Sequence, residues 1–156
     1  MSFEYPEHIR FVCERCALCC GDTSSRNRTI LLLKLEADRI SEKASMNAEE
    51  FAEKVEGHDP YMYRAKKTRE GKCVFLSGET CTVYSVRPLI CRFYPFELKP
   101  AGNKRYVFSY TDECPSIGKG SCLRKSYFRK LFAELERTLK EAWSEKELDS
   151  AHKTHF

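Results

Sequence analysis

Nine cysteines constrain this chain of 156 residues more than any other feature, because they are clustered along the sequence. Four of them lie in FVCERCALCCGD at positions 11–22, and two of these four are adjacent. The full set is Cys13, Cys16, Cys19, Cys20, Cys73, Cys81, Cys91, Cys114 and Cys122. The odd number excludes a complete set of intrachain disulfides.

The remainder of the sequence favours a reducing environment for these thiols. The start, MSFEYPEHIR, is polar and lacks the apolar segment of a secretory signal. No apolar run approaches the roughly 20 residues of a membrane span. We therefore expect a cytoplasmic protein without membrane contact, where structural disulfides are rare and clustered cysteines bind metal or do redox chemistry. The net charge of +4 is too weak a bias to predict nucleic-acid binding.

The spacing of the first group is typical of a metal site. Cys-x-x-Cys brings two sulfur atoms to one centre, and here the step repeats through Cys13, Cys16 and Cys19. Three such thiolates can hold three corners of an iron–sulfur cubane, with a distant fourth ligand. Cys114 is followed by Pro115, as the distant ligand is in bacterial ferredoxins.

The doubled cysteine suggests a second centre. Neighbouring side chains point to opposite sides of an extended backbone. On that basis we expect Cys19 and Cys20 to face different sites, with Gly21 allowing a sharp turn. The second site would take its other ligands from Cys73, Cys81 and Cys91.

Four thiolates suit both zinc and an iron–sulfur cluster, so the residues leave the metal open. Zinc would make a closed structural site, whereas a cluster would add electron transfer. Three arginines, Arg15, Arg87 and Arg92, lie beside the candidate ligands. Their charge would offset the thiolates and raise the reduction potential of a cluster.

The periodicity predicts an α+β fold: one small irregular domain over residues 1–143, stabilised by metal, with a flexible tail at 144–156. The expected strands are short, at 29–33, 72–76, 81–84 and 105–111. Two helices are expected in the cysteine-free insert, at 35–43 and from Asn47 to about Gly57. A shaped loop is expected around Pro88, Pro95 and Pro100.

A long C-terminal helix is expected over 124–143, with apolar residues at nearly 3.6-residue spacing. The main interpretation is that this stripe packs on the core. The alternative is that part of it contacts a protein partner.

Taken together, the motifs resemble the YkgJ-type cysteine-cluster family, whose domain is described as zinc- or iron-chelating and is similar to a domain of flagellin lysine N-methylases. The resemblance covers about residues 11–120 and rests on Cys13-x-x-Cys16-x-x-Cys19-Cys20, Cys73-Val-Phe-Leu, Cys81-Thr-Val-Tyr, Arg87-Pro88-x-x-Cys91-Arg92-x-x-Pro95-Phe96 and Cys114-Pro115. It implies eight metal ligands: Cys13, Cys16, Cys19, Cys20, Cys73, Cys81, Cys91 and Cys114. Cys122 lies outside the motif. Ala17 and Ser116 replace glycines that are frequent in the family.

Three functions follow as hypotheses. The first is a metal-binding protein with one or two iron–sulfur clusters, expected to be [4Fe–4S], acting in electron transfer or as an accessory to another enzyme. The second is a structural zinc module for partner binding. The third is a methyltransferase-like enzyme that uses S-adenosylmethionine, by analogy with the flagellin methylases. Whether the chain is an enzyme stays open, and no catalytic residue is identified.

Overall fold

The computed structural model describes residues 2–153, with side chains described as far as Ser144. Its helices are α1 (Lys34–Ala44), α2 (Ala48–Phe51), α3 (Leu89–Phe93) and α4 (Lys125–Lys153), with 3-10 turns η1 (Leu18–Cys20) and η2 (Tyr84–Val86). Its strands are β1 (Ser2–Glu4), β2 (Arg10–Phe11), β3 (Leu31–Leu32), β4 (Ala52–Lys54), β5 (Tyr63–Ala65), β6 (Leu76–Ser77), β7 (Thr80–Cys81), β8 (Phe96–Pro100), β9 (Arg105–Tyr110) and β10 (Ile117–Cys122). The predicted α+β class is therefore confirmed.

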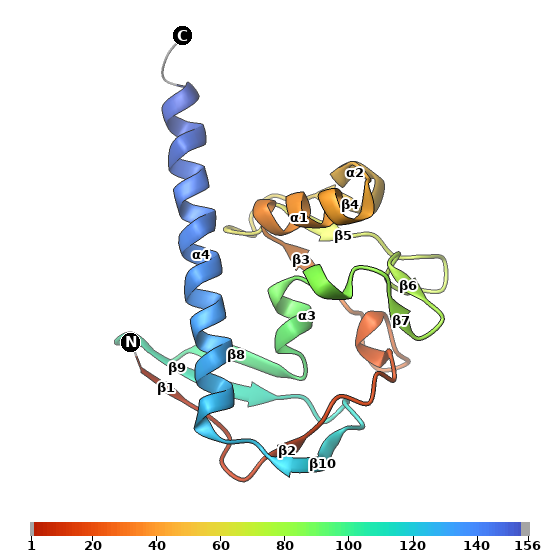
Figure 1. Cartoon of the computed structure of the whole chain (residues 1–156), viewed down its shortest axis with the longest axis vertical. Helices are drawn as coiled ribbons and strands as arrows, with labels where there is room; N and C mark the ends of the chain where they lie inside the picture. The colour runs from red at the N-terminus through yellow and green to blue at the C-terminus, as the bar shows by residue number, and fades with distance from the viewer. Residues whose placement is uncertain (1, 154–156) are drawn as a thin grey trace.

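One half of the molecule is built on the sheet β1-β9-β8. β1 runs parallel to β9, and β8 pairs with β9 as an antiparallel hairpin. The first turns of α4 pass beside this sheet (Figure 1). Between them lies the aromatic core, which consists of Ile9, Leu89, Phe93, Phe96, Phe108, Phe128, Leu131 and Phe132.

The other half is formed mainly by the insert between the first two cysteine groups. Its sheet has the order β3-β5-β4, and α1 and α2 lie beside it (Figure 1). The insert core consists of Ile30, Leu32, Ala37, Ile40, Phe51, Ala52, Phe75 and Val83. Cys73, Cys81 and Cys91 pack against this core, so three of the predicted ligands form part of its wall.

A buried carboxylate joins the two halves. Glu36 of α1 is only 2% exposed. Its carboxylate accepts hydrogen bonds from the backbone N–H of Leu33 (2.9 Å) and from that of Leu89 (2.7 Å), at the start of α3. Burial raises the pKa of this carboxyl group. The two N–H donors satisfy the charged form, because each belongs to a helix start that lacks an internal acceptor.

The predictions for α1, β3 and β9 agree with the structure. The strands predicted at 72–76 and 81–84 are wrong over most of their length: only Leu76 and Cys81 lie in strands, the two-residue β6 and β7, and η2 begins at Tyr84.

The second insert helix is wrong in length. Asn47 does start it, with its N–H donating to the Glu50 carboxylate at 2.7 Å, but the helix ends at Phe51 and the chain enters β4. The predicted loop around the prolines instead contains α3 and β8.

The C-terminal helix is longer than predicted. It runs to Lys153 and so includes most of the segment assigned to a tail, whose flexibility stays a prediction. Phe128, Leu131 and Phe132 are buried, as expected for a stripe that packs on the core, whereas Trp143 is 56% exposed. Among the described residues, none of the helices combines the length and apolar character that crossing a membrane requires.

Candidate metal centre

The first cysteine group lies on a tight turn. Arg15 and Ala17 have positive φ angles of 56° and 63°, and Ala17 precedes η1. The N–H of Cys20 donates to the carbonyl of Ala17 at 3.0 Å. The expectation that Cys19 and Cys20 face different sites assumed extended backbone, whereas the chain turns here. Which site each of the two cysteines serves stays a prediction.

After this turn the chain crosses the segment that leads to the second cysteine group. The N–H of Cys73 donates to the carbonyl of Cys20 at 2.6 Å, and that of Asp22 to the carbonyl of Gly71 at 2.8 Å. Gly21 is extended here, with φ of 171°, so it does not supply the sharp turn that was predicted. A Cβ at Gly21 would lie 2.6 Å from the Gly71 carbonyl oxygen. Glycine is therefore required by the close approach of the two chains, which brings Cys20 next to Cys73.

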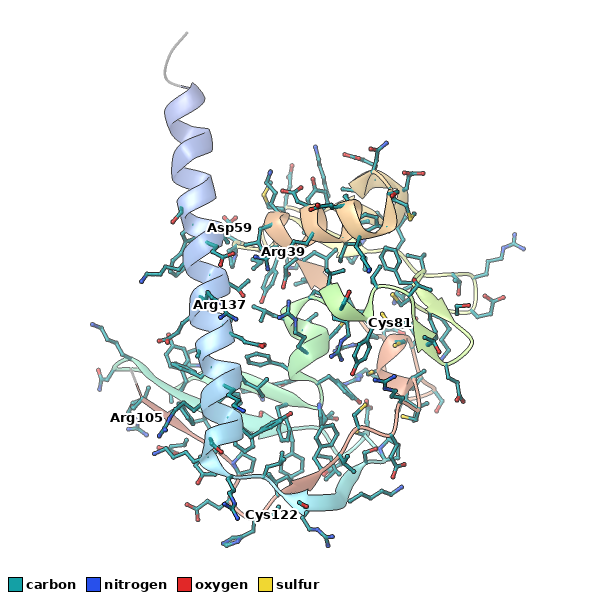
Figure 2. The ribbon with its side chains drawn as sticks, in the orientation of Figure 1. Arg39, Asp59, Cys81, Arg105, Cys122 and Arg137 are labelled. Atoms are coloured by element: carbon teal, nitrogen blue, oxygen red, sulfur yellow. The ribbon has the colours of Figure 1, made fainter. Side chains whose placement is uncertain are left out.

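The first cavity lies between this crossing, the β6–β7 hairpin and α3. Its volume is about 200 Å³. Six cysteines line it: Cys13, Cys19, Cys20, Cys73, Cys81 and Cys91. Figure 2 shows Cys81 in this part of the molecule, with several sulfur atoms around it. The remaining wall is largely apolar and includes Ile30, Leu32 and Phe75 of the insert core.

The second cavity adjoins the first and has a volume of about 180 Å³. Cys13, Cys16, Cys19, Cys91 and Cys114 line it, so three cysteines are shared with the first cavity. Tyr94, Ser116 and Tyr127 form part of its wall. The structure thus brings all eight predicted ligands to the walls of two adjoining cavities.

Cys122 is placed apart from them. It is exposed, lies at the end of β10 and lines neither cavity. Figure 2 shows Cys122 at the opposite end of the molecule from α2, well away from Cys81. Its position matches its place outside the sequence motif.

Burial favours the protonated form of three of these thiols, those of Cys73, Cys91 and Cys114. Desolvation raises the pKa of Cys91 to about 12 and also raises the pKa values of Cys73 and Cys114. The hydrogen bond to Cys20, followed by burial, raises the pKa of Cys19, and the same hydrogen bond lowers the pKa of Cys20. Metal binding therefore has to displace protons from these sites.

Backbone N–H groups oppose this effect at two sulfur atoms. The backbone N–H of Phe75 lowers the pKa of the Cys73 thiol, and those of Ser116 and Ile117 lower the pKa of the Cys114 thiol, against the stronger effect of burial. The Ile117 N–H donates to the Cys114 carbonyl at 3.2 Å. N–H donors near a sulfur atom favour the thiolate and orient it for a metal. The donor set and these contacts therefore fit a metal that is bound by thiolates.

Among the described residues, no three histidine, cysteine or acidic side chains already stand close enough to hold a metal ion. Side-chain adjustment of the cysteines around the cavities would have to accompany binding. The role of each cysteine as a ligand stays a prediction.

Arginines surround the cavities, and one of them was missed in the sequence. Arg15 and Arg87 stack on the ring of Tyr84, at 4.7 and 3.7 Å from its centroid. Arg28 was not predicted, because it lies eight residues after the last cysteine of the first group. Its Nε donates to the Cys19 carbonyl at 3.2 Å, and its charge lowers the pKa values of Cys19 and Cys91 against the stronger effects that raise them.

Comparisons with known proteins found similarity to a family and to a relative. The sequence model of the CxxCxxCC family, described as "Putative zinc- or iron-chelating domain", matches residues 12–116, more than half of the chain. An uncharacterized protein of Methanocaldococcus jannaschii is 28% identical over 106 residues, which cover 64% of this chain and 52% of that relative. The chain therefore spans about half the length of this relative. No solved structure shows significant similarity to the chain.

Proposed function

The chain belongs to the CxxCxxCC family of zinc- or iron-chelating domains, and on that premise we propose that it carries one or two iron–sulfur clusters. It acts in electron transfer or as an accessory to another enzyme. Such a cluster supplies reversible one-electron transfer when it is bound.

The observation that supports this proposal is the convergence of eight cysteines on two adjoining cavities. A water molecule in the liquid takes up about 30 Å³. Cavities of about 200 and 180 Å³ therefore offer more room than a single ion needs. Two adjoining centres would also suit the passage of an electron from one to the other.

The proposal assigns the cysteines by the walls on which they lie. Cys20, Cys73, Cys81 and Cys91 would serve the first cavity. Cys13, Cys16, Cys19 and Cys114 would serve the second. The wall of the first cavity is largely apolar. Nearby backbone N–H groups favour the thiolate forms of Cys73 and Cys114.

Metal analysis of protein purified without oxygen tests this function. We expect a brown protein that contains iron and acid-labile sulfide. Cys20→Ser should lower the iron content, whereas Cys122→Ser, the matched control outside the cavities, should retain it.

A colourless protein with zinc in stoichiometric amount would overturn the iron–sulfur proposal. It would favour the structural zinc module, since eight sulfur atoms also make two four-cysteine sites. Folded protein that binds neither metal would overturn both readings.

A further inference from the structure

A buried hydroxyl group at the wall of the second cavity has no hydrogen-bond partner among the residues that the structure describes. Ser116 is 1% exposed, and its Oγ makes no hydrogen bond to any residue that the structure describes. A buried hydroxyl without a partner is unfavourable, because it has lost its hydrogen bonds to water. The Ser116 hydroxyl is therefore available to donate to a hydrogen-bond acceptor of the functional protein.

The surroundings of Ser116 identify the chemistry of that group. Ser116 lies on the cavity wall with Cys13, Cys16 and Cys114. Its own backbone N–H favours the thiolate form of Cys114, two residues earlier. The Ser116 residue thus shares a cavity wall with atoms that become electron-rich thiolates when a metal binds, and a thiolate sulfur accepts hydrogen bonds.

We propose that the Ser116 hydroxyl is a positioning donor for the metal group of the second cavity: it donates a hydrogen bond to a metal-bound sulfur. This inference rests on the proposed function, because it requires a thiolate-bound metal. The inference goes beyond the proposed function, because it assigns a role to a residue that is not a ligand. The backbone N–H donors would remain if the side chain were changed, so the hydroxyl can be tested alone.

Zn²⁺ is a suitable probe, since its affinity can be measured by chelator competition whichever metal is native. Ser116→Ala should weaken Zn²⁺ binding by about tenfold, the lower end of the range for outer-shell partners of metal ligands. Ser116→Thr, which keeps a hydroxyl, should retain most of the affinity. Ser85→Ala, at an exposed serine of η2 that lines neither cavity, should leave it unchanged.

A second measurement separates this role from packing. Without metal, Ser116→Ala should be at least as stable to urea as the natural protein, because the variant removes a buried unpaired group. Equal Zn²⁺ affinity of Ser116→Ala and the natural protein would overturn the inference and indicate that a water molecule satisfies the hydroxyl. Equal weakening by Ala and Thr, with lower stability of both, would also overturn it. Absence of Zn²⁺ and iron binding by the natural protein would instead contradict the proposed function.

Discussion

The aromatic core and the insert core are closed in different ways. The aromatic core contains five phenylalanines, and the first turns of α4 cover it with hydrocarbon. The insert core contains two phenylalanines among smaller side chains, and Cys73, Cys81 and Cys91 form part of its boundary. The core of the aromatic half is therefore enclosed by apolar side chains, whereas the core of the insert half borders a cavity that is lined by thiols.

This difference indicates where stability comes from in each half. Burial of apolar area stabilises the aromatic half whether or not metal is bound. The insert half should depend on metal, because metal binding to ligands from separate segments is coupled to folding. The stability of the insert half should therefore depend on bound metal, whereas that of the aromatic half should not.

The largest effect is expected in the aromatic core. Phe128 is fully buried and contacts the rings of Tyr5, Phe96 and Phe108. Phe128→Ala should lower the free energy of unfolding by about 3–5 kcal/mol, the range for large core truncations. Urea denaturation should give a similar loss with and without metal. Trp143→Ala, at an exposed position, is the control, and a loss for Phe128→Ala that depends on metal would contradict the comparison.

The next effect concerns the link between the halves. Glu36→Ala leaves the N–H groups of Leu33 and Leu89 buried without an acceptor. It should lower the free energy of unfolding by about 2–4 kcal/mol. Because Leu89 starts the helix that carries Cys91, we expect metal affinity to fall as well. Asp38→Ala, on the same helix but exposed, should cost far less, and equal losses for the two variants would contradict this role.

Removal of metal should lower the local stability of the insert half much more than that of the aromatic half. Amide hydrogen exchange in β5 and in the β6–β7 hairpin should accelerate by about a hundredfold or more after chelation, equivalent to about 2.7 kcal/mol. Amides of β8 and β9 should change much less, because their core contains no thiol. Uniform acceleration across both halves would show that the molecule unfolds as one unit.

The smallest effect is expected at Cys122. Its side chain is exposed, and its Sγ makes a weak contact with the Leu123 carbonyl at 3.9 Å. Cys122→Ser should change the free energy of unfolding by less than about 0.5 kcal/mol. Thermal unfolding and metal content should both match the natural protein, and a loss of metal would show that the site assignment is wrong.

The sequence predicted the elements whose signal is local. The β-branched and aromatic run at 105–111 gave β9, and apolar spacing gave α1 and most of α4. The signals of these helices and strands each lie within a short window of the chain. The family resemblance, which rests on motifs between Cys13 and Cys114, implied the eight cysteines that line the cavities.

The rest depends on contacts between distant segments. β1 has three residues and is held by parallel pairing with β9, about a hundred positions later. α3 has five residues, too few to show helical periodicity, and the Glu36 carboxylate accepts from its first N–H. The orientation of Cys19 and Cys20 depends on the left-handed backbone conformation of Ala17. Residues other than glycine seldom adopt this conformation, and the composition does not reveal it.

The crossing at Gly21 has a further consequence for the insert. The insert begins after Cys20 and ends at Cys73. Backbone hydrogen bonds join the two segments there, and this junction forms a neck. The separation of the Cys20 and Cys73 backbones is thus set at the neck and not by the length of the loop beyond it. Since the entropy of closing a loop grows only slowly with its length, additional residues at an exposed turn such as Gly57 should leave the thiol cavities unaltered.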